Sequence, residues 1–397
     1  MVQRWCAVIR VGFLINFSDR LLGNLNYFRN LIEAIGRLEN RKIEPVILTG
    51  YSSDLDLTKD FPTVEIVKTK ILDRKSPAWI LHKVSQFVLP NDIIMERLLR
   101  KYDISVLSHS GSVGRHSKIK CIGWIPDFQH KYLSELFSKA EINYRDLMHR
   151  KLFKECTSVI VSSCDSLADV KKFYPEYVDK TKVLQFVAGP LEKIRLLSRE
   201  ELEYKYKFSG PYFHVPNQFW VHKNHKTVID ALGVLKEKGI KTLVILTGKT
   251  YDHRQPQYFN DIMAHIEDQN LKDSLRILGV VPYCDLVSIM RNSIAIINPS
   301  SFEGWSSTVE EAKSLGKRVI LSDIPVHREQ NPQGGYFFGV NDAEMLADIL
   351  QNILEDLPSF KDEHMSHVSK RELIDRKLFF AKQYQDIVID VCNKVPV

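Results

Sequence analysis

The 397-residue sequence lacks the features of membrane-spanning, zinc-binding and disulfide-stapled proteins. No apolar run reaches the roughly 18–20 residues that a spanning helix needs. The six cysteines form no Cys-x-x-Cys pair and no regular spacing, which argues against zinc and disulfides and favours a reducing cytoplasm. A P-loop is also missing, and no Gly-x-Gly-x-x-Gly follows the first apolar run, which weakens a dinucleotide oxidoreductase interpretation.

The N-terminal apolar run lacks two marks of a secretory signal. Arg10 interrupts it, and no small-residue cleavage site follows. Residues 7–15 are therefore predicted to form a buried first strand, and the protein is expected to be cytoplasmic.

Positive charge is concentrated in one part of the chain. The net charge is +6, whereas residues 66–160 hold 17 Lys or Arg against 9 Asp or Glu, a local balance of +8. Such a region suits an anionic partner such as a phosphate or an acidic lipid surface, and is equally compatible with an ordinary solvated surface. No nucleic-acid motif accompanies it, so no nucleic-acid partner is expected.

Short apolar runs alternate with segments of helical period, the pattern of a parallel α/β sheet. The expected strands are residues 7–15, 44–49, 63–67, 104–108, 120–125, 158–161 and 182–186, then 212–216, 242–247, 274–281, 294–298 and 318–322. The expected helices are residues 24–38, 91–100, 142–156 and 166–173, then 225–237, 258–269, 284–291, 307–315, 343–354 and 369–392. A polar stretch, residues 191–209, interrupts the alternation and is interpreted as a linker.

Two doubly wound domains follow from this pattern. Residues 1–205 form the first, completed by a C-terminal helix at about 372–397, and residues 206–371 form the second. A ligand is expected at the carboxyl ends of the strands, in a central cleft that the two domains face.

Residues 294–323 carry the chemistry. A buried strand is expected to end at Pro299, because proline cannot continue a central ladder. A loop with Glu303 beside Gly304 follows, and the next helix is expected to stop at Gly316. Small hydroxyl residues at the start of this helix can cap it: Ser306, Ser307 and Thr308. The free N–H groups and positive dipole end of the helix predict a phosphate site at the strand ends.

Acidic residues flank this predicted phosphate site. Glu303 and Glu311 cannot bind phosphate, but carboxylates suit sugar and ribose hydroxyls, so the pattern describes a nucleotide-sugar pocket. The alternative stays open that Glu310 and Glu311 only favour the helix dipole and that Glu303 is a solvated loop residue.

This segment resembles the donor-site signature of retaining GT-B glycosyltransferases, above all glycosyltransferase family 4. That signature places two glutamates in a Pro-Ser-x-x-Glu-Gly-x-x-x-x-x-x-Glu-Ala context. The chain reads Pro299-Ser-Ser-Phe-Glu303-Gly304-Trp-Ser-Ser-Thr-Val-Glu310-Glu311-Ala312 and continues with Gly316-Lys-Arg-Val-Ile. The resemblance implies two Rossmann-like domains, with Glu303 on donor-sugar hydroxyls and Glu311 on the ribose. It also implies that amides at Ser306–Thr308 contact sugar or phosphate oxygens.

The family opens its second domain with an arginine and a lysine on the donor pyrophosphate. Lys223, in His222-Lys223-Asn224, matches the lysine, but Asn217 stands at the arginine position. One cation fewer is then expected at the leaving group, unless Lys226 or another residue compensates. An exposed lysine early in a helix is the competing interpretation of Lys223.

Two further segments match the family more weakly. Gly23 lies where the family has paired glycines facing the phosphates, although a glycine opening the first helix is common in doubly wound folds. Residues 376–384 resemble the closing helix, although their apolar stripe is equally typical of core packing.

Three residues of the N-terminal half are candidates for acceptor or sugar contacts. Related sequences often carry a His or Asp after the strand expected at residues 120–125. The resemblance therefore makes Asp127 a candidate catalytic residue, together with Lys223 and Glu303. His130 and His109 are candidate acceptor contacts. A Pro-Asp turn that caps the next helix is the competing explanation of Asp127, and a structural role is favoured for His130.

The resemblance implies a retaining, metal-independent hexosyltransferase without a cofactor. A nucleoside diphosphate sugar would donate a hexosyl or deoxyhexosyl group to a glycan or lipid-linked saccharide, in polysaccharide or glycoconjugate synthesis. The basic helix at 142–156 suggests peripheral contact with the inner face of a membrane, or a buried stripe with a solvated rim. A nucleotide-sugar epimerase or phosphorylase of the same fold, or a non-catalytic sugar-nucleotide-binding module, stays open.

Overall fold

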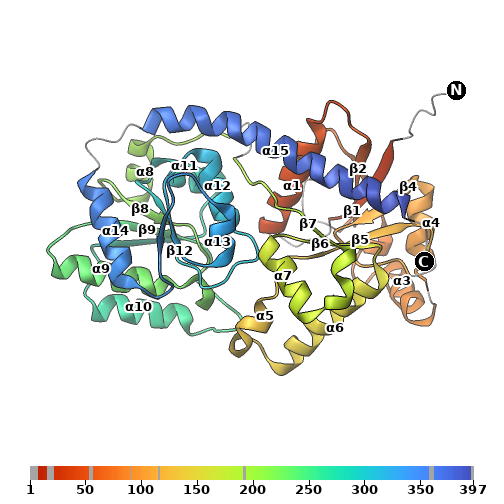
Figure 1. The fold of residues 1–397 in the computed structure, drawn as a ribbon, viewed down its shortest axis with the longest axis horizontal. Coiled ribbons are helices and arrows are strands. Elements are labelled where there is room, and N and C mark those ends of the chain that lie inside the picture. Colours follow the sequence, from red (N-terminus) through yellow and green to blue (C-terminus); the bar gives the residue numbers. More distant parts are fainter. Residues whose placement is uncertain are drawn as a thin grey trace. The chain divides into compact units, whose positions relative to one another are not determined.

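The computed structural model describes residues 8–15, 22–52, 57–89, 91–114, 117–190, 194–356 and 362–394. The chain divides into two compact units (Figure 1). Unit 1 comprises Met1–Lys131, Ser138–Val187 and Asp375–Val397, and unit 2 comprises Tyr132–Phe137 and Ala188–Ile374.

Unit 1 is built on a seven-stranded, all-parallel sheet in the order β3-β2-β1-β4-β5-β6-β7. Its strands are β1 (Ile9–Leu14), β2 (Ile43–Thr49), β3 (Glu65–Lys68), β4 (Ile104–Ser108), β5 (Lys120–Ile125), β6 (Ser158–Val161) and β7 (Thr181–Val183). The helices between them are α1 (Leu22–Gly36), α2 (Leu57–Asp60), α3 (Pro77–Val88), α4 (Ile93–Lys101), α5 (Gln129–Tyr132), α6 (Lys139–Glu155) and α7 (Cys164–Phe173).

Unit 2 repeats this architecture with a six-stranded parallel sheet in the order β10-β9-β8-β11-β12-β13. Its strands are β8 (Phe213–Val215), β9 (Val244–Thr247), β10 (Leu275–Gly279), β11 (Ile296–Asn298), β12 (Val319–Ser322) and β13 (Tyr336–Phe338). Its helical elements are α8 (Arg199–Tyr206), η5 (Val221–Lys223), α9 (His225–Glu237), α10 (Tyr258–Asp268), α11 (Tyr283–Asn292), α12 (Ser307–Leu315), α13 (Pro325–Gln330) and α14 (Ala343–Glu355).

Both sheets reverse their strand order at one point. In unit 2 the chain leaves β8 toward β9 on one side and later returns to β11 on the other. Ligands of doubly wound folds bind outside the carboxyl ends of the strands at such a switch point. A ligand site is therefore expected at the loops after β8 and β11.

The predicted linker is partly wrong, because it contains a helix of unit 2. α8 begins with a capping box in which Ser198 and Glu201 bond each other's backbone. Leu202 is fully buried in a core cluster with Tyr212 and Ile289. This packing places the boundary between the units at Val187–Ala188 rather than at 205/206.

The long C-terminal helix α15 (Asp362–Asn393) contributes to unit 1 from Asp375 onward (Figure 1). The Nζ atom of Lys377 lies 3.0 Å from both carboxylate oxygens of Glu33 on α1, and Tyr384 is fully buried. None of the helices in the described ranges is both long enough and apolar enough to cross a membrane.

Candidate functional site

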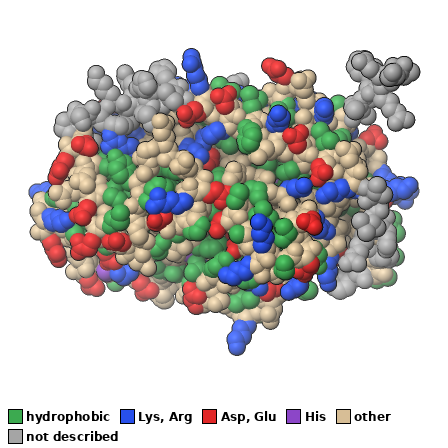
Figure 2. Space-filling model, in the orientation of Figure 1, with side chains coloured by type: hydrophobic (Ala, Val, Ile, Leu, Met, Phe, Trp, Pro, Cys, Tyr) green, Lys and Arg blue, Asp and Glu red, His purple; other side chains and the backbone are tan. Residues whose placement is uncertain are grey.

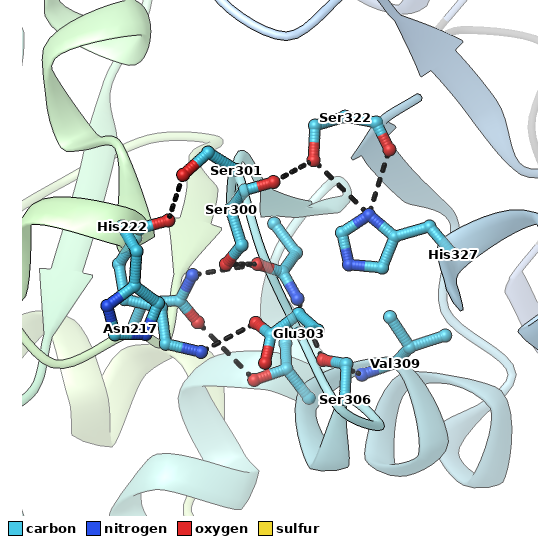
Figure 3. Close-up of polar contacts among 12 residues, drawn as sticks. Asn217, His222, Ser300, Ser301, Glu303, Ser306, Val309, Ser322 and His327 are labelled. Atoms are coloured by element: carbon cyan, nitrogen blue, oxygen red, sulfur yellow. Dashed lines mark hydrogen bonds and ion pairs between the residues drawn. The ribbon is translucent and has the colours of Figure 1, made fainter. Parts of the chain in front are cut away.

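Three loops meet at the carboxyl edge of the unit 2 sheet, after β8, β11 and β12 (Figure 3). The first carries Asn217 and Lys223, and the second carries Glu303 and the capping residue of α12. The third leads into α13, which carries His327. The strand order brings these loops together, because β8 and β11 are neighbours and β12 lies next to β11.

Lys223 and Glu303 form an ion pair in which Nζ lies 2.5 Å from Oε1. Their side chains are only 16% and 10% exposed. Burial alone would raise the pKa of the Glu303 carboxyl, but the nearby Lys223 ammonium outweighs it and lowers that pKa to about 2. Glu303 is therefore ionised at neutral pH and can only accept hydrogen bonds.

Backbone contacts hold the two loops of this pair together. The carbonyl oxygen of His222 accepts a hydrogen bond from the Ser301 N–H at 2.8 Å and another from the Ser301 hydroxyl at 3.3 Å (Figure 3). Asn224 then turns the chain into α9 with a positive φ of 51°. Each charged side chain is thus only one or two residues away from a fixed backbone contact.

The N-terminus of α12 is fixed from two sides. Ser306 caps the helix by accepting the Val309 N–H at 3.4 Å. The buried amide of Gln330 accepts the Ser306 N–H at 3.2 Å and donates to the Ser306 carbonyl at 2.9 Å. Within the described ranges the N–H groups of Ser307 and Thr308 have no acceptor. Two amides at the positive end of the helix are therefore available to an anion.

Asn217 connects the first loop to this helix end. It is 3% exposed, and its Nδ2 donates to Asn298 Oδ1 at 2.9 Å. Asn298 in turn donates to the Ser306 hydroxyl at 2.8 Å, and the Thr308 hydroxyl donates to Asn217 Oδ1 at 3.4 Å (Figure 3). The residue at the expected arginine position thus holds the loops in place as part of a buried network.

Replacing Asn217 with alanine is expected to lower the free energy of unfolding by about 1–3 kcal/mol, because Asn298 loses its 2.9 Å donor and the buried Thr308 hydroxyl loses its acceptor. Urea unfolding followed by circular dichroism measures this. Thr308→Val, which removes only the long 3.4 Å bond, is the matched control and should have a smaller effect. Wild-type stability of Asn217→Ala together with a complete loss of donor binding would instead mean that this side chain contacts the ligand.

The adjacent acids Glu310 and Glu311 differ in their surroundings. Glu310 is 2% exposed and accepts hydrogen bonds from Gln330 Nε2 at 3.1 Å and Lys313 Nζ at 3.2 Å. Glu311 has no polar partner in the described part of the chain, and burial raises the pKa of its carboxyl to about 7. Glu310 is therefore part of the structure, and Glu311 keeps its oxygens for a ligand.

His327 is a member of this region that the sequence did not reveal. Its Nδ1 lies 2.8 Å from the Ser322 carbonyl, which can only accept, so Nδ1 carries the proton (Figure 3). Burial lowers the pKa of the imidazole, although the Glu303 carboxylate opposes this, so the ring is neutral. Its buried Nε2 has no partner among the described residues. The one available signal was a histidine shortly after a buried strand, at the edge where ligands bind.

The remaining predicted donor residues are placed as follows. Gly304 is partly exposed in the loop after β11, and Ser307 is exposed at the first position of α12. Lys226, the suggested substitute cation, pairs with Asp230 on its own helix at 2.6 Å. Gly23 lies in the first turn of α1, and its surroundings are outside the described residues.

The candidates in unit 1 bond to neighbours within that unit. Asp127 Oδ1 accepts the Gln129 N–H at 3.0 Å, as expected of a turn that precedes a helix. His130 is 1% exposed, with Nε2 2.9 Å from Asp146 Oδ1, and burial lowers its pKa. Their contact with an acceptor stays a prediction.

His109 uses both ring nitrogens. Nε2 lies 2.7 Å from the Tyr27 hydroxyl and Nδ1 lies 2.9 Å from the Ser108 hydroxyl. Its φ is 57°, and burial lowers its pKa to about 3. It therefore packs as a neutral ring, and an acceptor contact also stays a prediction here. In the described ranges no three His, Cys, Asp or Glu side chains are grouped so as to hold a metal ion.

Comparison with known proteins gives a family for the second unit. Residues 205–371 match the family model described as "Glycosyl transferases group 1". The chain is 24% identical over 253 residues to the O-antigen chain mannosyltransferase RfbU of Salmonella typhimurium, covering 64% of this chain and 66% of that protein, just under two thirds. It is also 24% identical over 282 residues to the UDP-Gal:alpha-D-GlcNAc-diphosphoundecaprenol alpha-1,3-galactosyltransferase of Escherichia coli, covering 66% and 70% of the two chains.

The fold is also shared with solved structures. Anabaena Alr3699/HepE in complex with UDP-glucose matches with a TM-score of 0.66 and 16% identity, covering 96% of this chain and 100% of that chain. Residues 205–371 are therefore a glycosyl transferases group 1 domain, and the two Rossmann-like units have the GT-B fold, as predicted.

Proposed function

We propose that this chain is a metal-independent, retaining glycosyltransferase of family 4 type. It moves a hexosyl or deoxyhexosyl group from a nucleoside diphosphate sugar to a hydroxyl of a glycan or lipid-linked saccharide. The observation that carries the proposal is the Lys223–Glu303 pair next to the free N-terminal amides of α12, at the switch point of a glycosyl transferases group 1 domain.

The donor's groups match this set of side chains. The diphosphate is assigned to Lys223 and to the amides of Ser307 and Thr308, which offer positive charge and unused N–H donors. Hydroxyls of the donor sugar bind the ionised Glu303, and the ribose hydroxyls bind Glu311, whose oxygens have no other partner in the described chain. Donor binding therefore replaces the Lys223–Glu303 ion pair with two ligand contacts. Lys223 then contacts the diphosphate, and Glu303 contacts the sugar hydroxyls.

The transfer step then depends mainly on electrostatic stabilisation of the leaving phosphate. As the bond between the anomeric carbon and the β-phosphate breaks, negative charge grows on the phosphate oxygen, where Lys223 and the α12 amides stabilise it. The acceptor hydroxyl attacks from the same face, and its proton goes to the leaving phosphate oxygen. Net retention follows without a nucleophilic side chain.

The proposed acceptor is a lipid-linked saccharide of polysaccharide synthesis. The support is that the two sequence relatives named above are transferases whose names place them in O-antigen or diphosphoundecaprenol-linked glycan assembly. At 24% identity these names support the class of acceptor rather than one sugar or one linkage.

The deciding experiment measures nucleotide release from a panel of nucleoside diphosphate sugars, with and without glycan and lipid-linked acceptors, in the presence of EDTA. Mass spectrometry identifies the product, and NMR assigns its anomeric configuration. We expect acceptor-dependent release that survives EDTA and gives a product with the donor's configuration. Turnover without acceptor would favour an epimerase or hydrolase, and binding without turnover would favour a non-catalytic module.

A further inference from the structure

His327 is a fully buried histidine with one unused ring nitrogen, close to the Lys223–Glu303 pair. Its Nδ1 lies 2.8 Å from the Ser322 carbonyl oxygen, and the neutral ring therefore carries its proton there. Nε2 then presents only a lone pair, so it can accept a hydrogen bond but cannot donate one. No group in the described ranges donates to it. Figure 3 shows Nδ1 facing Ser322 and the other ring nitrogen on the side that faces Glu303.

The Glu303 carboxylate is a second acceptor close to this nitrogen. Burial lowers the pKa of the His327 imidazole and Glu303 opposes this shift, which requires the two groups to be near each other. The Ser322 hydroxyl also donates to the Ser300 carbonyl, so the residue that anchors His327 is tied to the loop that carries Glu303. Lys223 donates to Glu303 Oε1, but nothing donates to Nε2. Two acceptors thus lie side by side with too few donors between them.

An unused histidine nitrogen is not by itself a ligand site in this structure. His214 on β8 is also fully buried, with Nε2 2.9 Å from the Thr247 hydroxyl and Nδ1 without a partner in the described chain. Surface charge does not mark a site either, since both signs are interspersed on the face shown in Figure 2. His327 differs from His214 because a carboxylate lies near its ring, at the ligand-binding edge of the sheet.

We infer that His327 Nε2 accepts a hydrogen bond from a hydroxyl of the donor sugar, next to the hydroxyl that Glu303 binds. The inference rests on the proposed function and adds the class of donor, which is a sugar with two free hydroxyls on neighbouring carbons. Hydroxyls can donate to both acceptors, whereas ionised phosphate oxygens have no proton to offer. A sugar that lacks either hydroxyl would leave a buried acceptor without a partner, which weakens binding.

The test measures binding by calorimetry without an acceptor. The probes are UDP-glucose, UDP-galactose, UDP-N-acetylglucosamine and GDP-mannose, together with free UDP and GDP. His327→Asn keeps an amide N–H for the Ser322 carbonyl and removes the acceptor, whereas His327→Gln can place an amide oxygen near the position of Nε2. His214→Gln is the matched control, because it replaces a buried histidine that also has an unused nitrogen.

We expect His327→Asn to bind the best donor about tenfold or more weakly than wild type and to bind the free nucleoside diphosphate equally well. His327→Gln and His214→Gln should bind both as wild type does. Deoxy analogues of the donor then identify the hydroxyl. The analogue that binds wild type more weakly should bind His327→Asn no worse than the parent donor does, and the same comparison with Glu303→Gln should identify the hydroxyl on the next carbon.

The inference is overturned if His327→Asn binds the donor as tightly as wild type, since Nε2 would then hold no more than a buried water. It is also overturned if His327 and Glu303 recognise hydroxyls on carbons that are not neighbours. Wild type that binds none of the four donors would overturn the proposed function as well. If His327→Asn does not fold, ¹⁵N spectra of the wild-type histidine rings decide: the Nε2 resonance must move with the donor and not with the free nucleotide.

Discussion

Replacing Lys223 with methionine is expected to lower kcat by about 100- to 1000-fold while leaving the fold intact, because the leaving phosphate loses its ammonium donor. The Nζ atom lies 2.5 Å from Glu303 Oε1, beside the helix end that offers the free amides. Steady-state nucleotide release with a saturating acceptor measures the change. A KM that changes less than kcat would mean that the ammonium acts mainly in the transition state.

A second variant distinguishes the effect of an unpaired buried carboxylate on stability from the effect of the lost ammonium on turnover. Lys223→Met leaves Glu303 as an unpaired, mostly buried carboxylate, which costs about 3–5 kcal/mol of stability. Lys223→Met/Glu303→Gln removes that charge, so it should regain stability in urea unfolding without regaining turnover. Recovery of both, or near-normal turnover of Lys223→Met, would contradict the site.

The same pair predicts a response to acid. The pKa of Glu303 is about 2 in the fold against an ordinary value of 4.5. A carboxyl with a lowered pKa stabilises the folded state above its unfolded value, and that contribution is lost as the pH falls from about 4.5 toward 2. The double variant should lack this part of the acid dependence, which urea unfolding at pH 6 and pH 3 would reveal.

Most of the fold was predictable from apolar periodicity. β4, β5, β6, α9 and α12 have the predicted bounds. Strands of a parallel sheet are buried on both faces, so they appear as apolar runs without alternation. α3 escaped prediction because its stripe faces outward and its buried residue, His82, is polar. β13 was missed because it has only three residues, Tyr336–Phe338.

The site was predictable only where its chemistry is local in sequence. Glu303 and the capping residues of α12 occur in one continuous motif, and Lys223 in another. The inward role of Asn217 depends on Asn298, 81 positions away, and Gln330 reaches Ser306 across 24 positions. Neither contact leaves a pattern in the local sequence, because the strand order of the sheet creates both.

Glu311→Gln is expected to have opposite effects on stability and on binding. The fold raises the pKa of this carboxyl from 4.5 to about 7 through burial, and it has no cation to compensate within the described ranges. A raised pKa means that the group's contribution is fully present below about pH 4.5 and is lost as the pH rises through 7. The variant should therefore match wild type in urea unfolding at pH 5 and exceed it at pH 8 by at most about 3 kcal/mol.

Although Glu311→Gln should be more stable than wild type at pH 8, it should bind the nucleoside diphosphate more weakly. Ribose hydroxyls donate to the ionised carboxylate, so Glu311→Gln is expected to weaken binding by about 10- to 100-fold at pH 8. Because ligand binding favours the ionised form, wild type should also release a proton on binding near pH 6, which calorimetry in buffers of different ionisation enthalpy measures. The variant should release none from this position.

Glu310→Gln is the matched control, since it changes the adjacent residue in the same helical turn. Its carboxylate already accepts from Gln330 and Lys313, so its replacement should destabilise the fold and leave the pH dependence of nucleotide binding unchanged. If the two variants exchange these phenotypes, Glu310 is the ribose ligand and Glu311 is the structural acid. If neither alters nucleotide binding, the first turn of α12 does not hold the nucleoside, and the diphosphate must be placed by Lys223 and the free amides alone.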